Sequence, residues 1–265
     1  MMNKFENLHI DLGNICELNH FVFTHSRKEN TVGVEYSTLC FHNEEVDTAS
    51  DPWQYYINKY GYRGNNWSFN NDAIAFFGCS FTFGTGVEKD IATVSQKLLN
   101  TECYNIGQPG ASAITILKTF NSFIKYYPVK TAIITLPMSS RIYYPVFNDT
   151  ISCWEYGSLL PNWEDLTTQS IYTHAYQFFN THTSLAYLYD YIQMTELSAK
   201  ISGTKIIWSS WDTDTREFLN SVVDTRRTVD IGTIGLDKAR DHLHPGPMFV
   251  QDWSLRIAKE IKKYL

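Results

Sequence analysis

The sequence contains few cysteines and no paired cysteine motif. Its thiols lie far apart, without a C-x-x-C pair and without the Cys/His spacing of a zinc site. An odd number of scattered cysteines is typical of a reducing compartment, where thiols pack as small apolar groups. We therefore expect buried thiols, no disulfide framework and no metal site. The five cysteines are Cys16, Cys40, Cys79, Cys103 and Cys153.

An excess of basic residues is absent, and so are long apolar runs. Lysine and arginine number 22 against 28 acidic residues, a net charge of −6, whereas nucleic-acid binders carry a basic surface. No stretch approaches about 18 consecutive apolar residues, and the first residues lack the apolar core of a signal peptide. We expect no nucleic-acid partner, no membrane partner and a cytoplasmic location. A hydrophobic content of 43% with 19% charged residues is typical of a globular chain.

The chain changes character near residue 70. Residues 1–70 are polar with short β-prone runs, and we expect an N-terminal extension of strands and loops packed on a main domain at 71–265. In the main domain, short apolar runs alternate with helical patterns. The expected strands are 73–77, 103–106, 131–136 and 205–208, with 227–231 as a fifth candidate, and the expected helices are 91–100, 111–126, 184–198 and 249–264.

This alternation predicts an α/β fold in which helices cover both faces of a parallel sheet. The expected architecture is a three-layer α/β/α sandwich with right-handed crossovers. In such sheets the chemistry lies at the carboxyl ends of the strands. Three of these ends carry unusual sequences, which are GCSFTFG at 78–84, NIGQPG at 105–110 and PMSSR at 137–141.

Aromatic residues make up 15% of the chain. They either fill the core or form a sugar-stacking surface. Many fall in residues 142–182, which we expect to be an irregular insertion serving as a substrate wall or as a protein interface. The aromatic residues singled out there are Tyr143, Tyr144, Trp154, Tyr156 and Trp163. After the fourth strand, Trp208, Trp211, Asp212 and Asp214 are expected near the same rim, where Trp211 either packs or stacks on a sugar.

Ser80 directly follows the first buried strand. A glycine-flanked strand-to-helix turn exposes a nucleophilic serine, although a serine there also serves as a helix cap. Other readings of the segment are excluded, because no G-K-[S/T] follows for a phosphate loop and Gly84-Thr-Gly86 lacks the third glycine of a dinucleotide site.

A nucleophilic serine needs a base and an orienting group. The segment DHLHPG at 241–246 offers both, because Asp241 and His244 are three residues apart on a tight turn. The carboxylate can then hold the imidazole tautomer, and the Ser80 hydroxyl is expected within hydrogen-bond reach of His244. The alternative is a polar surface loop before the last helix. His242 is the competing histidine.

The three motifs GCSFTFG, NIGQPG and DHLHPG, in this order, resemble those of the SGNH (GDSL-type) hydrolases. The resemblance covers residues 72–265 in layout, and it implies a flavodoxin-like sheet. The segment YGYRG at 60–64 resembles the strand that often precedes the serine block. Serine blocks reading GCSFT also resemble those of phage-encoded members, which would make the protein virion-associated.

The resemblance implies roles for individual residues. Ser80 matches the nucleophile, and Asp241 and His244 match the other members of the triad. The backbone N–H groups of Ser80 and Gly110 match two donors of the oxyanion hole. The chemistry needs no metal ion and no organic cofactor.

Two positions depart from the family pattern. Cys79 stands where the family usually has Asp, and we expect it to pack as a small apolar residue rather than act as a second nucleophile. The family's Gly-x-Asn-Asp block after the third strand is replaced by Met138-Ser-Ser-Arg141, so one oxyanion donor is missing. Loss of such a donor costs about 3–4 kcal/mol. Either Ser139, Ser140 or Arg141 substitutes, or Arg141 binds a charged substrate group or forms a structural ion pair.

The resemblance implies a serine esterase acting on a small acyl ester, for example an O-acetyl group on a carbohydrate. The missing Asn and the polar extension favour a different class, a non-catalytic structural or carbohydrate-binding protein with a virion component or another protein as partner. A third alternative is an O-acyltransferase, because both reactions share the acyl-enzyme.

Overall fold

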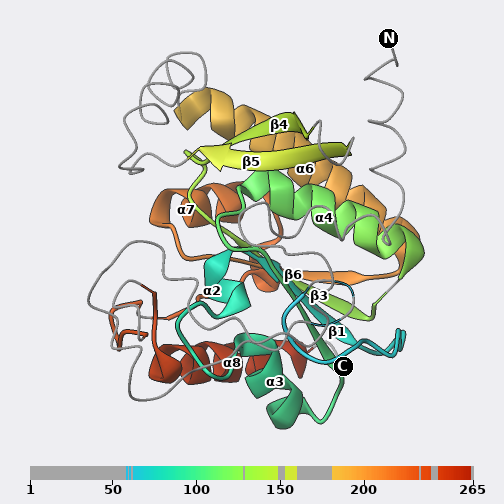
Figure 1. Ribbon diagram of the computed structural model, residues 1–265, viewed down its shortest axis with the longest axis vertical. Coiled ribbons are helices and arrows are strands. Elements are labelled where there is room, and N and C mark those ends of the chain that lie inside the picture. The colour runs from blue at the N-terminus through green and yellow to red at the C-terminus, as the bar shows by residue number, and fades with distance from the viewer. Residues whose placement is uncertain are drawn as a thin grey trace.

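The computed structural model describes residues 58, 60, 62–127, 129–148, 153–159, 181–232, 234–239 and 244–263, without the side chains of 143–148, 153–159 and 181. Its centre is a sheet of four parallel strands in the order β2-β1-β3-β6 (Figure 1). These are β1 (Ile74–Gly78), β2 (Cys103–Gly107), β3 (Thr131–Leu136) and β6 (Lys205–Ser210).

The strands form because their residues are apolar in succession and buried on both faces. Every residue of β1 and β3 is buried, as expected for central strands of a sheet covered on both sides. The neighbouring strands are in register, with Ile74 opposite both Cys103 of β2 and Thr131 of β3. All four strands therefore end at the same edge of the sheet, where the candidate motifs begin.

Helices cover the two faces of the sheet (Figure 1). On one face, α4 and α6 pack on Ala75 and Phe77, and α7 adds Leu219 to the same core. On the other face, α3 and α8 pack on Ile74 and Phe76. The helices are α3 (Ile91–Leu99), α4 (Ala113–Tyr126), α6 (Thr181–Ser202), α7 (Thr213–Val222) and α8 (Pro247–Ile261), with a short 3-10 helix η2 (Thr225–Arg227).

The expected α/β/α sandwich with a flavodoxin-like strand order is confirmed. The fifth candidate strand, 227–231, is reduced to one bridge between Trp208 and Thr228. The helix α7 was not expected, and β6 extends two residues beyond its expected end. Those two residues are polar and buried, and their hydroxyls find partners on β3: Ser209 with Thr135 at 2.7 Å, and Ser210 with the Leu136 carbonyl at 2.9 Å.

The expectation of an irregular insertion at 142–182 is wrong for its first part. Residues there form an antiparallel pair, β4 (Ile142–Asn148) and β5 (Cys153–Leu159), with Ile142 opposite Leu159. β4 is rich in β-branched and aromatic residues and β5 contains two aromatic residues, and both residue classes favour strands. The side chains of Tyr143, Tyr144, Trp154 and Tyr156, and the whole of Trp163, lie outside the described residues.

The part of the expected N-terminal extension that the structure describes packs into the main core. Tyr62 and Trp67 are buried there, and the Trp67 ring lies 5.3 Å from Tyr104 and 5.5 Å from Phe123. In the segment at 60–64, Arg63 lies in a β-bridge, and none of the described residues, 60 and 62–64, belongs to a strand of the sheet. The Arg63 side chain turns inward to bind backbone carbonyls.

Among the residues that the structure describes, no helix is long and apolar enough to cross a membrane.

Candidate active site

Ser80 begins the helix α2 (Ser80–Phe83) immediately after β1 and Cys79. This short helix ends at Gly84, whose φ of 78° gives the left-handed conformation typical of a helix end. Cys79 precedes the helix without a side-chain cap, so the first backbone N–H groups of α2 receive no capping oxygen from it. The Ser80 side chain is 6% exposed and lies at the carboxyl edge of the sheet.

Two glycines allow α2 to lie directly on the strand ends. At Gly78, the end of β1, an added Cβ would overlap the Thr82 hydroxyl. At Gly107, the end of β2, it would overlap the backbone nitrogen of Phe83 and lie 2.7 Å from its Cα. The glycines of both motifs therefore serve the close approach of backbone to backbone.

A Gly107→Ala substitution tests this approach. We expect the variant to lose about 1–3 kcal/mol of unfolding free energy, because the clash is with backbone that must shift as a unit. Urea denaturation followed by tryptophan fluorescence measures the loss. Gly235→Ala is the matched control, since a Cβ there meets nothing within 4 Å. Equal stability of the two variants would contradict the interpretation.

Asn105 joins the first two motifs. Its side-chain amide donates to the Thr82 carbonyl of α2 at 3.0 Å, and its side-chain oxygen accepts from the Gly107 N–H at 2.9 Å. The strand end is further tied by the Gln108 N–H, which donates to the Gly78 carbonyl at 2.8 Å. These bonds fix the loop after β2 against the helix that carries Ser80.

Gly110 lies on this loop with a φ of 79°. Neither its backbone N–H nor that of Ser80 donates a hydrogen bond to any group within the described residues. Both are therefore unoccupied donors, one at the start of α2 and one on the loop after β2, as the expected oxyanion role requires. Their place in an oxyanion hole stays a prediction.

His244 lies just before α8, and its position is fixed by backbone. Its carbonyl accepts from the Ala239 N–H at 2.8 Å, and Lys238 and Pro245 form a bridge. Asp237 caps α8 by accepting from the N–H groups of Met248 and Phe249 at 2.8 and 2.9 Å. Asp241 and His242 lie outside the described residues, so the third member of the predicted triad is not located.

Phe81, the residue after Ser80, connects the serine segment to the histidine segment. The ring of Phe81 meets the ring of His244 edge-on, with centroids 5.9 Å apart. The Ser80 hydroxyl itself makes no hydrogen bond within the described part of the chain. The direct Ser80–His244 bond therefore stays a prediction, with the two segments already in contact.

The loop after β3 and the residues after β6 form the rim of this edge. Ser139 donates its backbone N–H to the Thr215 hydroxyl at 3.1 Å, and Ser140 is half-buried. Trp211 stacks on Phe81 with a centroid distance of 4.9 Å. Arg141 lies over the Trp211 ring, with Cζ 5.4 Å from its centroid.

Cys79 packs as expected. It is fully buried, and its sulfur accepts a hydrogen bond from the Trp211 indole N–H at 3.3 Å. Cys103 is half-buried rather than buried, and desolvation raises the pKa of its thiol to about 12. Trp208 does not join the rim, because it is fully buried and donates its indole N–H to Glu196 at 2.7 Å. Within the described ranges, no three His, Cys, Asp or Glu residues gather as metal ligands.

Solved structures similar to this chain include esterases and a GDSL-family protein. A protein of Desulfitobacterium hafniense described as a lipolytic protein of the G-D-S-L family is 13% identical, with a TM-score of 0.48, over 72% of this chain and 99% of that one. An esterase from Pseudoalteromonas is 10% identical, with a TM-score of 0.45, over 73% and 98%. An acetyl xylan esterase from Butyrivibrio proteoclasticus is 13% identical, with a TM-score of 0.43, over 77% and 67%.

No family model matches the chain, and no curated protein sequence is significantly similar to it. Identities this low and TM-scores below 0.5 assign neither a substrate nor a catalytic residue. The chemistry of this site therefore rests on its own residues.

Three contributors to the site were not expected from the sequence. Phe81 contacts His244, Asp237 caps the helix after it, and Arg63 holds the segment after α2. Phe81 lies inside the serine motif, and that position was the one available signal. Most partners of Arg63 and both partners of Asp237 are backbone groups at a distance along the chain, which no side-chain pattern reveals.

Proposed function

We propose that this protein is a serine esterase in which Ser80 is the nucleophile and His244 is the general base. The observation that carries the proposal is the contact between Phe81 and His244, which places the serine and histidine segments together at the carboxyl edge of the sheet. Ser80 also stands where such folds place their reacting groups, at the end of a central strand.

In the proposed reaction, the Ser80 oxygen forms a bond to the ester carbonyl carbon while its proton passes to His244. The negative oxygen of the tetrahedral intermediate is stabilised by the Ser80 and Gly110 N–H groups. The intermediate then releases the alcohol, which takes the proton from His244, and leaves an acyl-enzyme. A water molecule activated by His244 attacks the acyl group and regenerates Ser80. Asp241 is proposed to orient the imidazole.

The proposed substrate is a small acyl ester, such as an O-acetyl group on a carbohydrate. The proposed steps involve only side chains and backbone of this chain, together with water.

A fluorophosphonate probe tests the proposal directly, because it reacts only with an activated serine. We expect the full chain to be labelled once, with the adduct on the peptide that contains Ser80. The measurement is intact mass followed by peptide mapping. Ser80→Ala should abolish labelling.

Ser221→Ala is the matched control, because Ser221 lies on the exposed surface of α7. We expect this variant to be labelled like the parent chain. A chain that unfolds cooperatively yet stays unlabelled would remove the proposal and favour the non-catalytic binding protein. Labelling of Ser80→Ala at another residue would remove Ser80 from the mechanism.

A further inference from the structure

Arg141 differs from the other arginines that the structure describes. Arg63, Arg216, Arg226, Arg227 and Arg256 each pair with an Asp or Glu carboxylate. Arg141 has no such partner within the described residues, so the expectation of a structural ion pair is not met there. An arginine that is half-buried without a counter-charge costs free energy unless a ligand supplies one.

The guanidinium of Arg141 is held in place by neutral groups. Its Nη1 donates to the Ala111 carbonyl at 3.1 Å, and its Cζ lies 5.4 Å from the centroid of the Trp211 ring. Its Nε is buried and has no acceptor, and its Nη2 likewise has none among the described groups. Because Nε is buried, Nη2 is the donor that remains for a charge-assisted hydrogen bond to a carboxylate.

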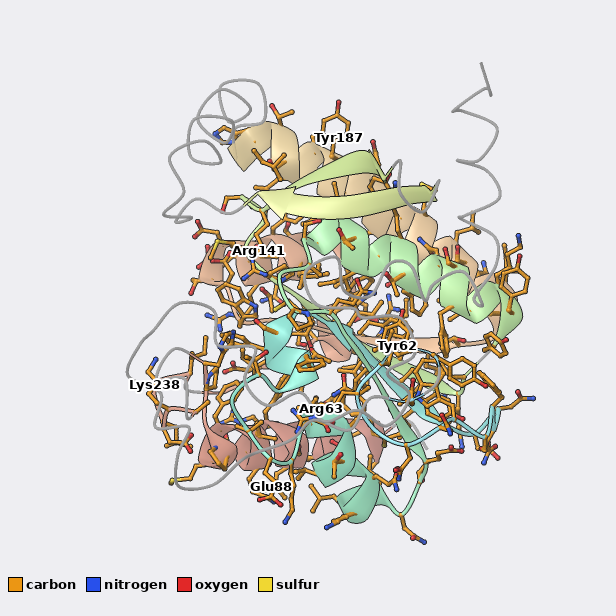
Figure 2. All side chains as sticks on the ribbon, in the orientation of Figure 1. Tyr62, Arg63, Glu88, Arg141, Tyr187 and Lys238 are labelled. Carbon is orange, nitrogen blue, oxygen red and sulfur yellow. The ribbon has the colours of Figure 1, made fainter. Side chains whose placement is uncertain are left out.

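The position of Arg141 relates it to the proposed reaction. Ala111 directly follows Gly110, and Trp211 stacks on Phe81, which follows Ser80 and contacts His244. Figure 2 shows Arg141 near α7, above α2. The guanidinium therefore contacts the residue after Gly110 directly, and it is linked to the residue after Ser80 through Trp211.

The two acidic residues that follow β6 in the described part of the chain do not pair with Arg141. Asp212 caps α7, where its carboxylate accepts from the N–H and hydroxyl of Thr215 at 2.9 and 2.8 Å. Asp214 is exposed in the first turn of α7. Neither of these two carboxylates therefore pairs with Arg141, in a chain whose net charge is −6.

We propose that Arg141 forms an anion-binding subsite, and that the preferred substrates are acyl esters that carry a carboxylate a few bonds from the scissile carbonyl. This proposal rests on the proposed esterase function and adds its substrate class. Trp211, whose ring also stacks on Phe81, supports the guanidinium from one side.

Two esters of equal length test the subsite. The 4-nitrophenyl monoester of adipic acid carries a carboxylate, and 4-nitrophenyl hexanoate does not. We expect the parent chain to have the higher kcat/KM for the adipate ester. In Arg141→Gln, that preference should fall roughly 10- to 100-fold, because a charge-assisted hydrogen bond is lost. The loss should appear in KM for the adipate ester, and Arg141→Lys should restore part of it.

Arg256→Gln is the matched control, since Arg256 lies on the exposed face of α8 and pairs with Asp252. We expect it to keep the parent preference, while higher salt concentration weakens the preference of the parent chain. A cooperative thermal unfolding transition verifies that each variant folds. If Arg141→Gln does not fold, Arg141→Lys replaces it in the comparison of the two esters.

Three outcomes would overturn the subsite. The first is a parent chain that hydrolyses both esters with equal kcat/KM. The second is an equal fall of kcat for both esters in Arg141→Gln, which would instead assign Arg141 to the oxyanion. The third is a preference for the adipate ester that survives Arg141→Gln. Hydrolysis of neither ester by the folded parent chain is a separate result, which removes the proposed function together with the subsite.

Discussion

Ser80→Ala is expected to lower kcat for 4-nitrophenyl acetate by roughly 10⁴- to 10⁶-fold. Without the hydroxyl no acyl-enzyme forms, and the remaining rate reflects only water attacking an ester held by the backbone donors. His244→Ala should lose a similar factor, because an alcohol without a base is a poor nucleophile at neutral pH. Steady-state hydrolysis followed by nitrophenolate absorbance measures both.

The double variant gives the stronger test of the pair. Residues that act as one unit in catalysis are not additive, so Ser80→Ala with His244→Ala should be no slower than either single variant. If the losses of kcat in the two single variants multiply in the double variant, the two residues act independently, which the proposed mechanism does not permit. This result bears on the Ser80–His244 relation more directly than the structure, in which the two segments meet through Phe81.

Cys79 provides the control for a thiol mechanism. Its side chain is fully buried and bonded to Trp211, so Cys79→Ala should retain activity within a few-fold of the parent chain. A loss as large as that of Ser80→Ala would instead make the thiol the nucleophile.

The sheet was predictable because its strands are buried on both faces. Such strands read as continuous apolar runs, and 131–136 was located to the residue. The end of β6 was harder to predict, because Ser209 and Ser210 are polar residues whose buried hydroxyls need hydrogen-bond partners in β3. The β4–β5 pair was missed because 142–182 was treated as one aromatic-rich segment, and the strand-forming residues at its start were not separated from the rest.

The motifs of the candidate site could be predicted from the sequence, whereas the contacts that hold these motifs in place were less predictable. Ser80 follows a buried strand, and its glycine neighbours mark the tight approach of α2 to the sheet. The interaction of Arg141 with Trp211 joins residues that follow different strands, so it depends on strand order as well as sequence. A pattern along the chain indicates which residues reach the sheet edge, while the contacts between loops at that edge require the fold.

Arg63 stabilises the connection between α2, which carries Ser80, and the next helix α3. Its guanidinium donates to the carbonyls of Phe83, Val87 and Glu88 at 3.0, 2.7 and 2.7 Å, and also to that of Gly84. It also pairs with Asp90 at 3.4 Å, and both side chains are nearly inaccessible, at 4% and 3% exposure. Arg63 lies between α2 and α3 (Figure 2), and it holds the whole connection from the serine helix to the next helix.

Arg63→Met should therefore lower the unfolding free energy by about 3–5 kcal/mol, because it leaves a buried carboxylate without its counter-charge and the Val87 and Glu88 carbonyls without a donor. Asp90 keeps part of its compensation, since it also caps α3 through the N–H groups of Ala92 and Thr93, so the loss should lie toward the lower end. Urea denaturation measures the change.

Arg256→Met is the matched control for this substitution, because it removes an exposed i,i+4 pair and should shift stability by at most about 0.5 kcal/mol. Equal shifts in the two variants would mean that the buried arginine is dispensable. If Arg63→Met loses this much stability, we expect the esterase activity of this variant to decline on heating over the same temperatures at which residues 83–90 unfold. These residues anchor the helix α2, which begins at Ser80.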